Sequence, residues 1–280
     1  MAFFACLTGV LLWQMRVDVV TRVARWALDQ QGLTDATFRL SQVSFGQVVV
    51  EDIRLGTPEA VLIVDQVDVR FSCREVLRRH IARVAVRGVR TRLTAGGGKA
   101  MSPLYERLKP LLAARAKTAP AGATANTGFS LGAGVLQEVQ VAVALAGGEP
   151  LTTLTLDAGV LAERPAQYRV WGTLSDGGGM QLRSEGVVDS DTGAGSLLPE
   201  LKIKSVGKLL DWAGRVFPDQ AARIPAFPTN CTLAVRGAVA VQGWTNVGPF
   251  EINAELGRGS AWVFPDQDAF VRFQSFRVEV

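Results

Sequence analysis

The chain has 280 residues, enough for one large domain or two ordinary ones with a substantial buried core. Hydrophobic residues make up 48% and charged residues 20%, a composition that excludes a disordered chain. The 30 lysines and arginines nearly balance 26 aspartates and glutamates, so the net charge of +4 is small for a nucleic-acid-binding protein. The spacing of Cys6, Cys73 and Cys231 matches no zinc site. Buried free thiols are favoured over a Cys73–Cys231 disulfide, which the sequence alone leaves open.

Residues 2–13 form an apolar run that is shorter than the roughly 20 residues of a full membrane span. The run lacks the preceding lysine or arginine of a secretory signal peptide. We favour a membrane anchor over a buried helix, and expect the natural start to lie upstream. Residues 17–28 then predict an amphipathic helix at the membrane surface, with a core helix of a soluble domain as the alternative. Its apolar residues at helical spacing are Val17, Val20, Val23, Ala24 and Ala27. Residues 1–31 are therefore the predicted membrane anchor and amphipathic helix.

Apolar and polar residues alternate from residue 32 to residue 94, which predicts strands joined by turns at Gly46 and at residues 56–58. In the run 61–71 one face is predicted to be apolar and the other wet. The apolar parity comprises Val61, Ile63, Val67, Val69 and Phe71, and the polar parity comprises Gln66, Asp68 and Arg70.

The segment 71–93 predicts a strand–helix–strand corner, with about two helical turns from Cys73. Val84 and Val86 share one parity of the return strand, whereas Val89 and Leu93 have the other. A bulge at Gly88 would restore all four side chains to one face. Residues 32–94 are therefore predicted to form one strand–helix–strand module.

Residues 95–127 are predicted to be a short helix and a flexible linker rich in alanine, threonine and proline. Residues 128–280 are predicted to form an antiparallel sheet, because many short alternating runs follow one another at hairpin-length gaps. One amphipathic helix is predicted to begin at Val206. The final run ends inside an alternating strand, so we expect the natural protein to continue beyond residue 280.

No residue has the surroundings of a catalytic group. His80 is the only histidine, and the neighbouring Arg78, Arg79 and Arg83 disfavour an imidazolium there. The glycine triplets at 96–98 and 177–179 lack the spacing of a phosphate-binding loop, and the second is predicted to be a hairpin turn. We expect no enzymatic activity, no cofactor and no metal.

Arginines cluster between residues 70 and 92, but no aromatic side chains alternate with them. Single-stranded nucleic-acid platforms combine both features. A solvated sheet edge or a surface facing lipid headgroups explains the arginines, so we expect no nucleic-acid binding.

The order of these elements resembles a known family. An apolar anchor and an amphipathic helix precede the strands "VVVEDIRLG" and "LIVDQVDVRFS", the helix "CREVLRR" and the return strand "IARVAVRGVRTRL". This order is similar to the amino-terminal module of the AsmA-like superfamily of Gram-negative envelopes, including its TamB and YdbH relatives. The tail "ELGRGSAWVFPDQDAFVRFQSFRVEV" is also YdbH-like. The resemblance covers the first 93 residues well and the rest mainly by strand pattern.

The resemblance implies a mainly β fold: an N-terminal helix followed by an elongated, curled antiparallel sheet that forms an open groove, with a few short helices. It implies a single-pass anchor in the inner membrane, with most of the chain in the periplasm. The implied function is phospholipid transport along the groove between the inner and outer membranes, with phospholipids, the inner membrane and an outer-membrane or periplasmic protein as partners. A groove that reaches from the inner to the outer membrane needs more than 280 residues, so the chain is expected to be an N-terminal portion or a shorter relative. The candidate lipid-contacting residues are Ile63, Val67, Val69, Phe71, Val84, Val86, Val89, Leu93, Leu154, Leu156, Val160, Leu233, Val235, Val239, Val241, Phe273 and Val278.

The alternation alone leaves two architectures open. A sheet with one apolar face buries that face against another layer, closes on itself as a sandwich or barrel, or covers it with lipid. The single convincing helix after residue 127 is too little to cover some nine predicted strands, and the resemblance favours the open groove. The alternative function is a scaffold for envelope assembly or secretion, whose sheet edges pair with partner proteins. An enzyme is the third hypothesis.

Overall fold

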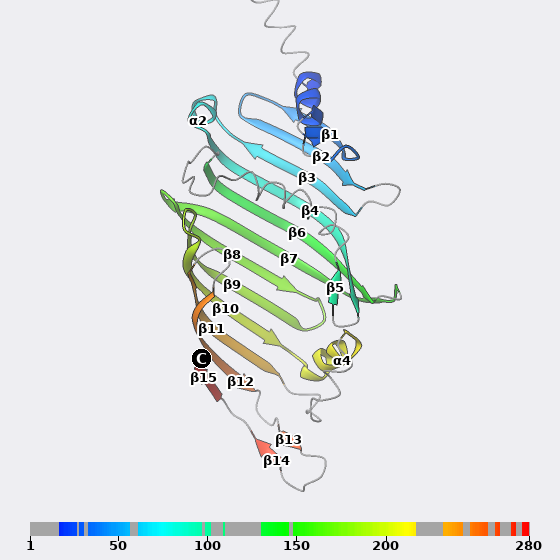
Figure 1. The fold of residues 1–280 in the computed structure, drawn as a ribbon, viewed down its shortest axis with the longest axis vertical. Helices are drawn as coiled ribbons and strands as arrows, with labels where there is room; N and C mark the ends of the chain where they lie inside the picture. Colours follow the sequence, from blue (N-terminus) through cyan, green and yellow to red (C-terminus); the bar gives the residue numbers. More distant parts are fainter. Residues whose placement is uncertain are drawn as a thin grey trace, which may run out of the picture. The chain divides into compact units, whose positions relative to one another are not determined.

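The computed structural model shown in Figure 1 describes two compact units. Unit 1 comprises Met1–Thr91 and Pro103–Gly134, and unit 2 comprises Arg92–Ser102 and Val135–Val280. Their described residues are mainly β-strands with few short helices, which confirms the predicted mainly β class. The structure describes residues 17–26, 28–30, 33–56, 61–96, 99–101, 109, 130–145, 148–216, 232–242, 247–256, 261–263, 270–272 and 276–279.

Unit 1 is a sheet of successive antiparallel strands that follows a helical segment. Residues 17–26 and 28–30 are helical, as predicted. The strands β1 (Thr37–Val43), β2 (Gln47–Leu55), β3 (Leu62–Arg70) and β4 (His80–Gly96) then pair in chain order, and β4 belongs to unit 1 as far as Thr91.

The predicted corner between β3 and β4 is confirmed. The helix α2 (Cys73–Leu77) begins with a capping box, in which the Ser72 hydroxyl accepts the Glu75 amide and the Glu75 carboxylate accepts the Ser72 amide. The helix ends where Arg79 adopts a positive φ of 55°, which turns the chain into β4. Cys73 is a free, exposed thiol.

The ladders of β2, β3 and β4 are interrupted at one aligned position. Asp52, Asp65 and Gly88 have no partner in the register, although the pairs on both sides keep the same offset. Asp52 and Gly88 have positive φ angles of 52° and 68°. Only glycine suits position 88, because a Cβ there would also overlap the Asp65 side chain.

This interruption changes the side-chain parity in all three strands together. Val67 pairs with Val86 before the interruption and Val64 pairs with Val89 after it, three positions along each strand. Val64 is buried, whereas Arg90, one residue beyond Val89, is exposed. The apolar pairs therefore stay on one face, as the predicted bulge at Gly88 requires, but the interruption is shared by β2 and β3.

One pair of strands departs from the prediction of an antiparallel sheet. The strand β6 (Ser130–Leu145) is the hydrogen-bonded neighbour of β4, and the first residues of the two strands lie side by side. The Ser130 amide donates to the Arg79 carbonyl, and Gly132 lies against Ala82. The two strands are thus parallel, and the sheet is mixed and open rather than wholly antiparallel. A parallel pair needs a long crossover, and the segment predicted as a linker, residues 95–127, supplies most of it.

Unit 2 is built from antiparallel hairpins in chain order. Its part of β4 pairs with β5 (Lys99–Met101), and from β7 to β12 each strand pairs with the next. β12 then pairs with β15, whereas β13 and β14 form a separate two-stranded sheet. The helix α4 (Val206–Val216) follows β10, as predicted. The strands are β7 (Pro150–Arg164), β8 (Gln167–Ser175), β9 (Met180–Asp189), β10 (Ala194–Ile203), β11 (Leu233–Gln242), β12 (Val247–Leu256), β13 (Ala261–Val263), β14 (Phe270–Arg272) and β15 (Phe276–Glu279).

Two glycines allow β9 and β10 to approach closely. A Cβ on Gly186 would overlap the carbonyl oxygen of Ser196, and a Cβ on Gly195 would overlap that of Val187. Glycine within a strand is typical of such close backbone approaches and of sharp bends. The sheet of unit 2 therefore depends on the absence of side chains at these two positions.

We expect Gly186→Ala to lower the free energy of unfolding by about 2 kcal/mol, since the neighbouring backbone must move to admit the methyl group. Gly172→Ala is the matched control in β8, because its Cβ would meet only ordinary contacts of 3.6 and 3.7 Å. Chemical denaturation of both variants measures the difference. Equal destabilisation by the two substitutions would contradict the close approach of β9 and β10.

Candidate functional site

The apolar face of unit 2 consists of rows of side chains that run across the strands. Residues directly opposite one another in paired strands have side chains on the same face. Consecutive pairs place leucine against leucine from β7 to β10, and the row ends at a valine of β11. This first row comprises Leu156, Leu174, Leu182, Leu201 and Val235.

A second apolar row runs parallel to the first, four residues along each strand. It comprises Val160, Val170, Gly186, Leu197 and Val239. Adjacent strands are separated by roughly 4.8 Å, so each row extends about 19 Å from β7 to β11. All ten residues are half-buried, with neither full burial nor full exposure.

The opposite face of the same strands is polar. On each strand a polar residue next to the apolar ones in sequence projects to this face. Across the five strands these residues are paired in one row: Asp157, Thr173, Arg183, Glu200 and Arg236. The Arg236 Nε donates to Glu200 Oε1 over 2.9 Å, and this hydrogen bond is the main cause that lowers the pKa of Glu200. These exposed ion pairs contribute little to stability but show which face is solvated.

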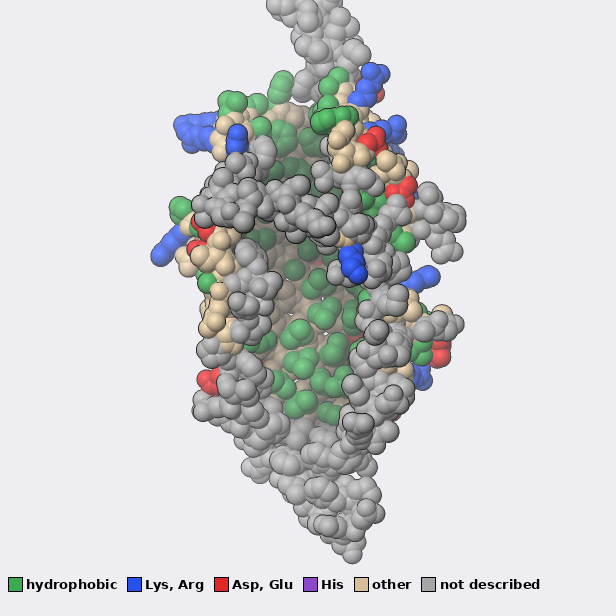
Figure 2. All heavy atoms as spheres, viewed as in Figure 1, with side chains coloured by type: hydrophobic (Ala, Val, Ile, Leu, Met, Phe, Trp, Pro, Cys, Tyr) green, Lys and Arg blue, Asp and Glu red, His purple; other side chains and the backbone are tan. Residues whose placement is uncertain are grey.

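The helix α4 covers one end of the apolar face. Its N-terminal part packs on Ile203, Met180 and Leu233, and its C-terminal Val216 packs on Val143. Of the two rows, only Leu201 belongs to these clusters. In the part of unit 2 that the structure describes, α4 is the only helix, and the nine row residues other than Leu201 lie outside the clusters that it forms. Figure 2 shows hydrophobic side chains gathered in a hollow over β7 to β11.

The structure brings together half of the lipid-contacting residues predicted in unit 2. Leu156, Val160, Val235 and Val239 lie in the two rows, and Val241 lies opposite Gly195 on the same face. Three others are partly buried in the clusters that α4 forms: Leu93 and Leu154 pack in the cluster that includes Trp212, and Leu233 packs beside Ile203. Phe273 lies outside the described residues. Val278 pairs with Ile252 in β15, where only the backbone is described.

The predicted residues of unit 1 divide between two faces. The apolar pairs are Val67 with Val86, Val69 with Val84, and Val89 with Val64. Ile63 instead pairs with Arg54 and Arg90, in a row of the solvated face. The prediction overlooked that β3 changes parity at Asp65. Phe71 lies just after β3, where its amide donates to the Gly46 carbonyl.

Several residues of the apolar rows were not among the predicted ones. Their signal was present, because Val170 and Leu174 share one parity in β8, as do Met180 and Leu182 in β9. Alternation identified the strands but could not show which residues of different strands lie opposite one another. The additional members are Gly186 and the apolar side chains of Val170, Leu174, Leu182, Leu197 and Leu201.

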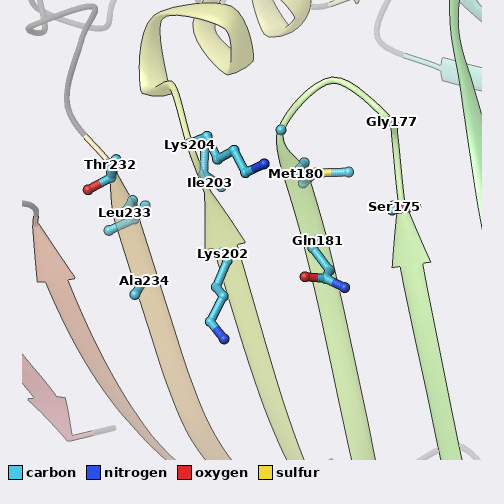
Figure 3. A pocket seen from close by; sticks show the side chains of 11 residues that line it. Ser175, Gly177, Met180, Gln181, Lys202, Ile203, Lys204, Thr232, Leu233 and Ala234 are labelled. Atoms are coloured by element: carbon cyan, nitrogen blue, oxygen red, sulfur yellow. The ribbon is translucent and has the colours of Figure 1, made fainter.

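Two cavities flank the junction between β10 and α4. The larger, of about 540 Å³, lies at the ends of β8 to β11 and is lined by Lys202 and Lys204 (Figure 3). The smaller, of about 130 Å³, lies between α4 and the sheet. Trp212 lines it, and the indole Nε1 is buried without a hydrogen-bond partner among the described residues.

The predicted turn at residues 177–179 is held by Asp176. Its Oδ1 accepts the amides of Gly178, Gly179 and Met180 over 2.8 to 2.9 Å. Burial by itself raises the pKa of Asp176, but these backbone hydrogen bonds outweigh it and lower the pKa. The turn positions both cavities, since Gly179 and Met180 line each of them.

His80 serves to join the starts of β4 and β6. Its Nδ1 lies 2.8 Å from the Ser130 hydroxyl, which is exposed and also lies near the Arg79 carbonyl. Within the described residues, no group of three histidine, cysteine or acidic side chains is arranged to hold a metal ion. Nor does any helix in those residues have the length and apolar character needed to cross a membrane. The predicted anchor, residues 2–13, lies outside them.

Comparison with known proteins identifies no relative: no protein-family model matches the chain, and no curated protein matches it.

We predict that Trp212→Phe leaves the free energy of unfolding unchanged or raises it by up to about 1 kcal/mol, because it removes an unsatisfied buried donor. Trp212→Ala is expected to lower it by about 3 kcal/mol by leaving a cavity under α4. Chemical denaturation of the two variants makes the comparison. A loss for the phenylalanine variant as large as for the alanine variant would show that Nε1 has a partner.

The lowered pKa of Asp176 predicts an acid sensitivity. A carboxylate whose folded-state pKa is lowered stabilises the fold above its unfolded pKa of about 4, and this contribution is lost as the pH falls further. We expect Asp176→Asn to reduce the stability difference between pH 6 and pH 3. Denaturant titrations at the two pH values measure it, and identical differences in the wild type and the variant would refute the role of the turn.

Proposed function

We propose that this protein is a non-enzymatic lipid carrier that moves phospholipids between the inner and outer membranes of a Gram-negative envelope. The acyl chains lie on the two apolar rows of unit 2, while the headgroups remain in water. The observation that supports this proposal is the first row, a continuous line of half-buried leucine and valine side chains over five strands.

The energetics of the apolar face favour an alkyl ligand. Covering apolar surface gains roughly 25 cal/mol per Å², so a face of this extent left in water is a liability for a soluble domain. An alkyl chain requires contact with methyl and methylene groups and no directional hydrogen bonds. The two rows offer side chains of that kind, with the polar groups of the same strands on the opposite face.

The helical residues 17–26 and 28–30 support a location at the inner membrane. Val19, Val23 and Trp26 are exposed at 48%, 58% and 64%, and their spacing places them along one stripe of the helix. Arg22 and Arg25 lie between them in sequence. A stripe of this composition suits the boundary between headgroups and acyl chains. The resemblance to AsmA-like proteins supports the same location, with most of the chain in the periplasm.

A second candidate function is a scaffold for envelope assembly or secretion. Trp171, Leu161 and Leu198 are exposed at 40%, 45% and 57% on the otherwise polar face of unit 2. Trp171 lies over Gly159, where a Cβ would overlap its ring. Exposed aromatic and leucine side chains of this kind suit a protein partner.

Photocrosslinking tests the lipid-carrier proposal, with neighbouring residues as a matched pair. A photoreactive amino acid at position 235 is expected to capture phospholipid, whereas the same amino acid at position 236 projects to the polar face and is expected to capture little. Mass spectrometry of the purified adducts gives the ratio. Equal capture at both positions, or protein that carries no lipid in native mass spectrometry, would refute the proposal.

Val235→Asp provides the functional counterpart of that experiment. A carboxylate in the first row opposes the seating of an acyl chain, so we expect bound phospholipid to fall several-fold. Circular dichroism should report an unchanged sheet, because Val235 is half-exposed. Unfolding of the variant would indicate a closed core at this position instead of a ligand-binding face.

A further inference from the structure

The larger cavity at the ends of β8 to β11 has a composition unlike that of the apolar face. We call it the lysine basin, after Lys202 of β10 and Lys204, which follows the end of that strand. The Lys204 amide donates to the Gly179 carbonyl over 2.8 Å. Lys202 lies opposite Gln181 and Ala234, which belong to the polar rows. Lys202 therefore projects to the polar face, whereas Met180, Ile203 and Leu233 of the lining belong to the apolar cluster beside α4. Its lining residues are Ser175, Gly177, Gly179, Met180, Gln181, Lys202, Ile203, Lys204, Thr232, Leu233 and Ala234.

Small residues make the basin hollow. Gly179 and Ala234 lie beside the two lysines, on the strands to either side of β10. A Cβ on Gly179 would lie 3.2 Å from the Lys204 Cβ, so this glycine gives the lysine room to extend. Figure 3 shows Lys204 reaching toward the β8–β9 turn, while Lys202 and Gln181 project from neighbouring strands. The resulting volume of about 540 Å³ is ample for a phosphate group.

The basin carries positive charge that its own lining does not neutralise. Among the described residues that line it, none is an aspartate or glutamate. Lys204 forms no salt bridge with a described residue. Lys202 lies 3.3 Å from Glu200, but the same Glu200 oxygen accepts the closer Arg236 Nε at 2.9 Å. The carboxylate is therefore shared, and both ammonium groups are able to turn toward a ligand.

We propose that the lysine basin binds a phosphate group. Two ammonium groups and the Gln181 amide can donate charge-assisted or neutral hydrogen bonds to phosphate oxygens. The described lining holds no carboxylate that would repel an anion. The phosphate comes either from a lipid headgroup or from a soluble phosphate ester. The proposal does not depend on the proposed lipid-carrying function of the apolar rows.

The test compares Lys204→Gln with Lys208→Gln, each of which removes one positive charge. Lys208 is exposed on α4 and does not line the basin, so its variant controls for net charge. One arm titrates inorganic phosphate by isothermal calorimetry. The other measures flotation of the full chain with vesicles of phosphatidylcholine containing phosphatidylglycerol. Because Lys204→Gln removes a charge-assisted hydrogen bond, it is expected to weaken phosphate binding about 10-fold.

The two arms distinguish the sources. Loss of both phosphate and vesicle binding in Lys204→Gln, with Lys208→Gln unchanged, identifies a lipid headgroup site. Loss of phosphate binding alone identifies a site for a soluble phosphate ester. No phosphate binding by the wild type, or equal losses in the two lysine variants, would overturn the proposal. Neither of these negative results alters lipid capture at position 235, so failure of the basin is distinct from failure of the apolar rows.

Discussion

The register that keeps leucine opposite leucine is the constraint on which unit 2 depends. Side-chain direction alternates along every strand, so a slip of one residue would move a whole strand's apolar set to the polar face. Between β7 and β10 the pairs Leu156–Leu174, Leu174–Leu182 and Leu182–Leu201 all keep to one face. The ion pairs of the opposite face oppose any slip, because each carboxylate would lose its arginine.

Unit 1 meets the same constraint by a different route. Its strands β2, β3 and β4 each change parity at one aligned position, marked by Asp52, Asp65 and Gly88. A bulge in a single strand would have shifted its partners by one residue. Because the three interruptions coincide, the offsets before and after them are equal and the apolar face continues. The parity change at Gly88 is therefore compatible with the sheet only because Asp65 and Asp52 change parity at the same position.

Much of the fold could be predicted from the sequence, because alternation is a local signal. The corner at Cys73–Leu77, the helix from Val206 and the turn at Gly177–Gly179 all follow from residue types a few positions apart. What alternation could not supply was the partner of each strand. The parallel pairing of β4 with β6 depends on where a long connection returns, and the place of Ile63 depends on an interruption in two neighbouring strands. The lysine basin was also missed, since its residues come from four strands.

The hairpin connectivity of unit 2 gives the sheet a modular character. From β7 to β12 each strand pairs with the next strand in the chain, so most long ladders are formed between segments that are close in sequence. Pairing of this kind has a low loop-closure cost and can proceed strand by strand. A further hairpin inserted into such a series would add two strands and lengthen each row by about 10 Å, while the order of the other strands would stay the same. Duplication of a short stretch of coding sequence is therefore enough to change the reach of the apolar face.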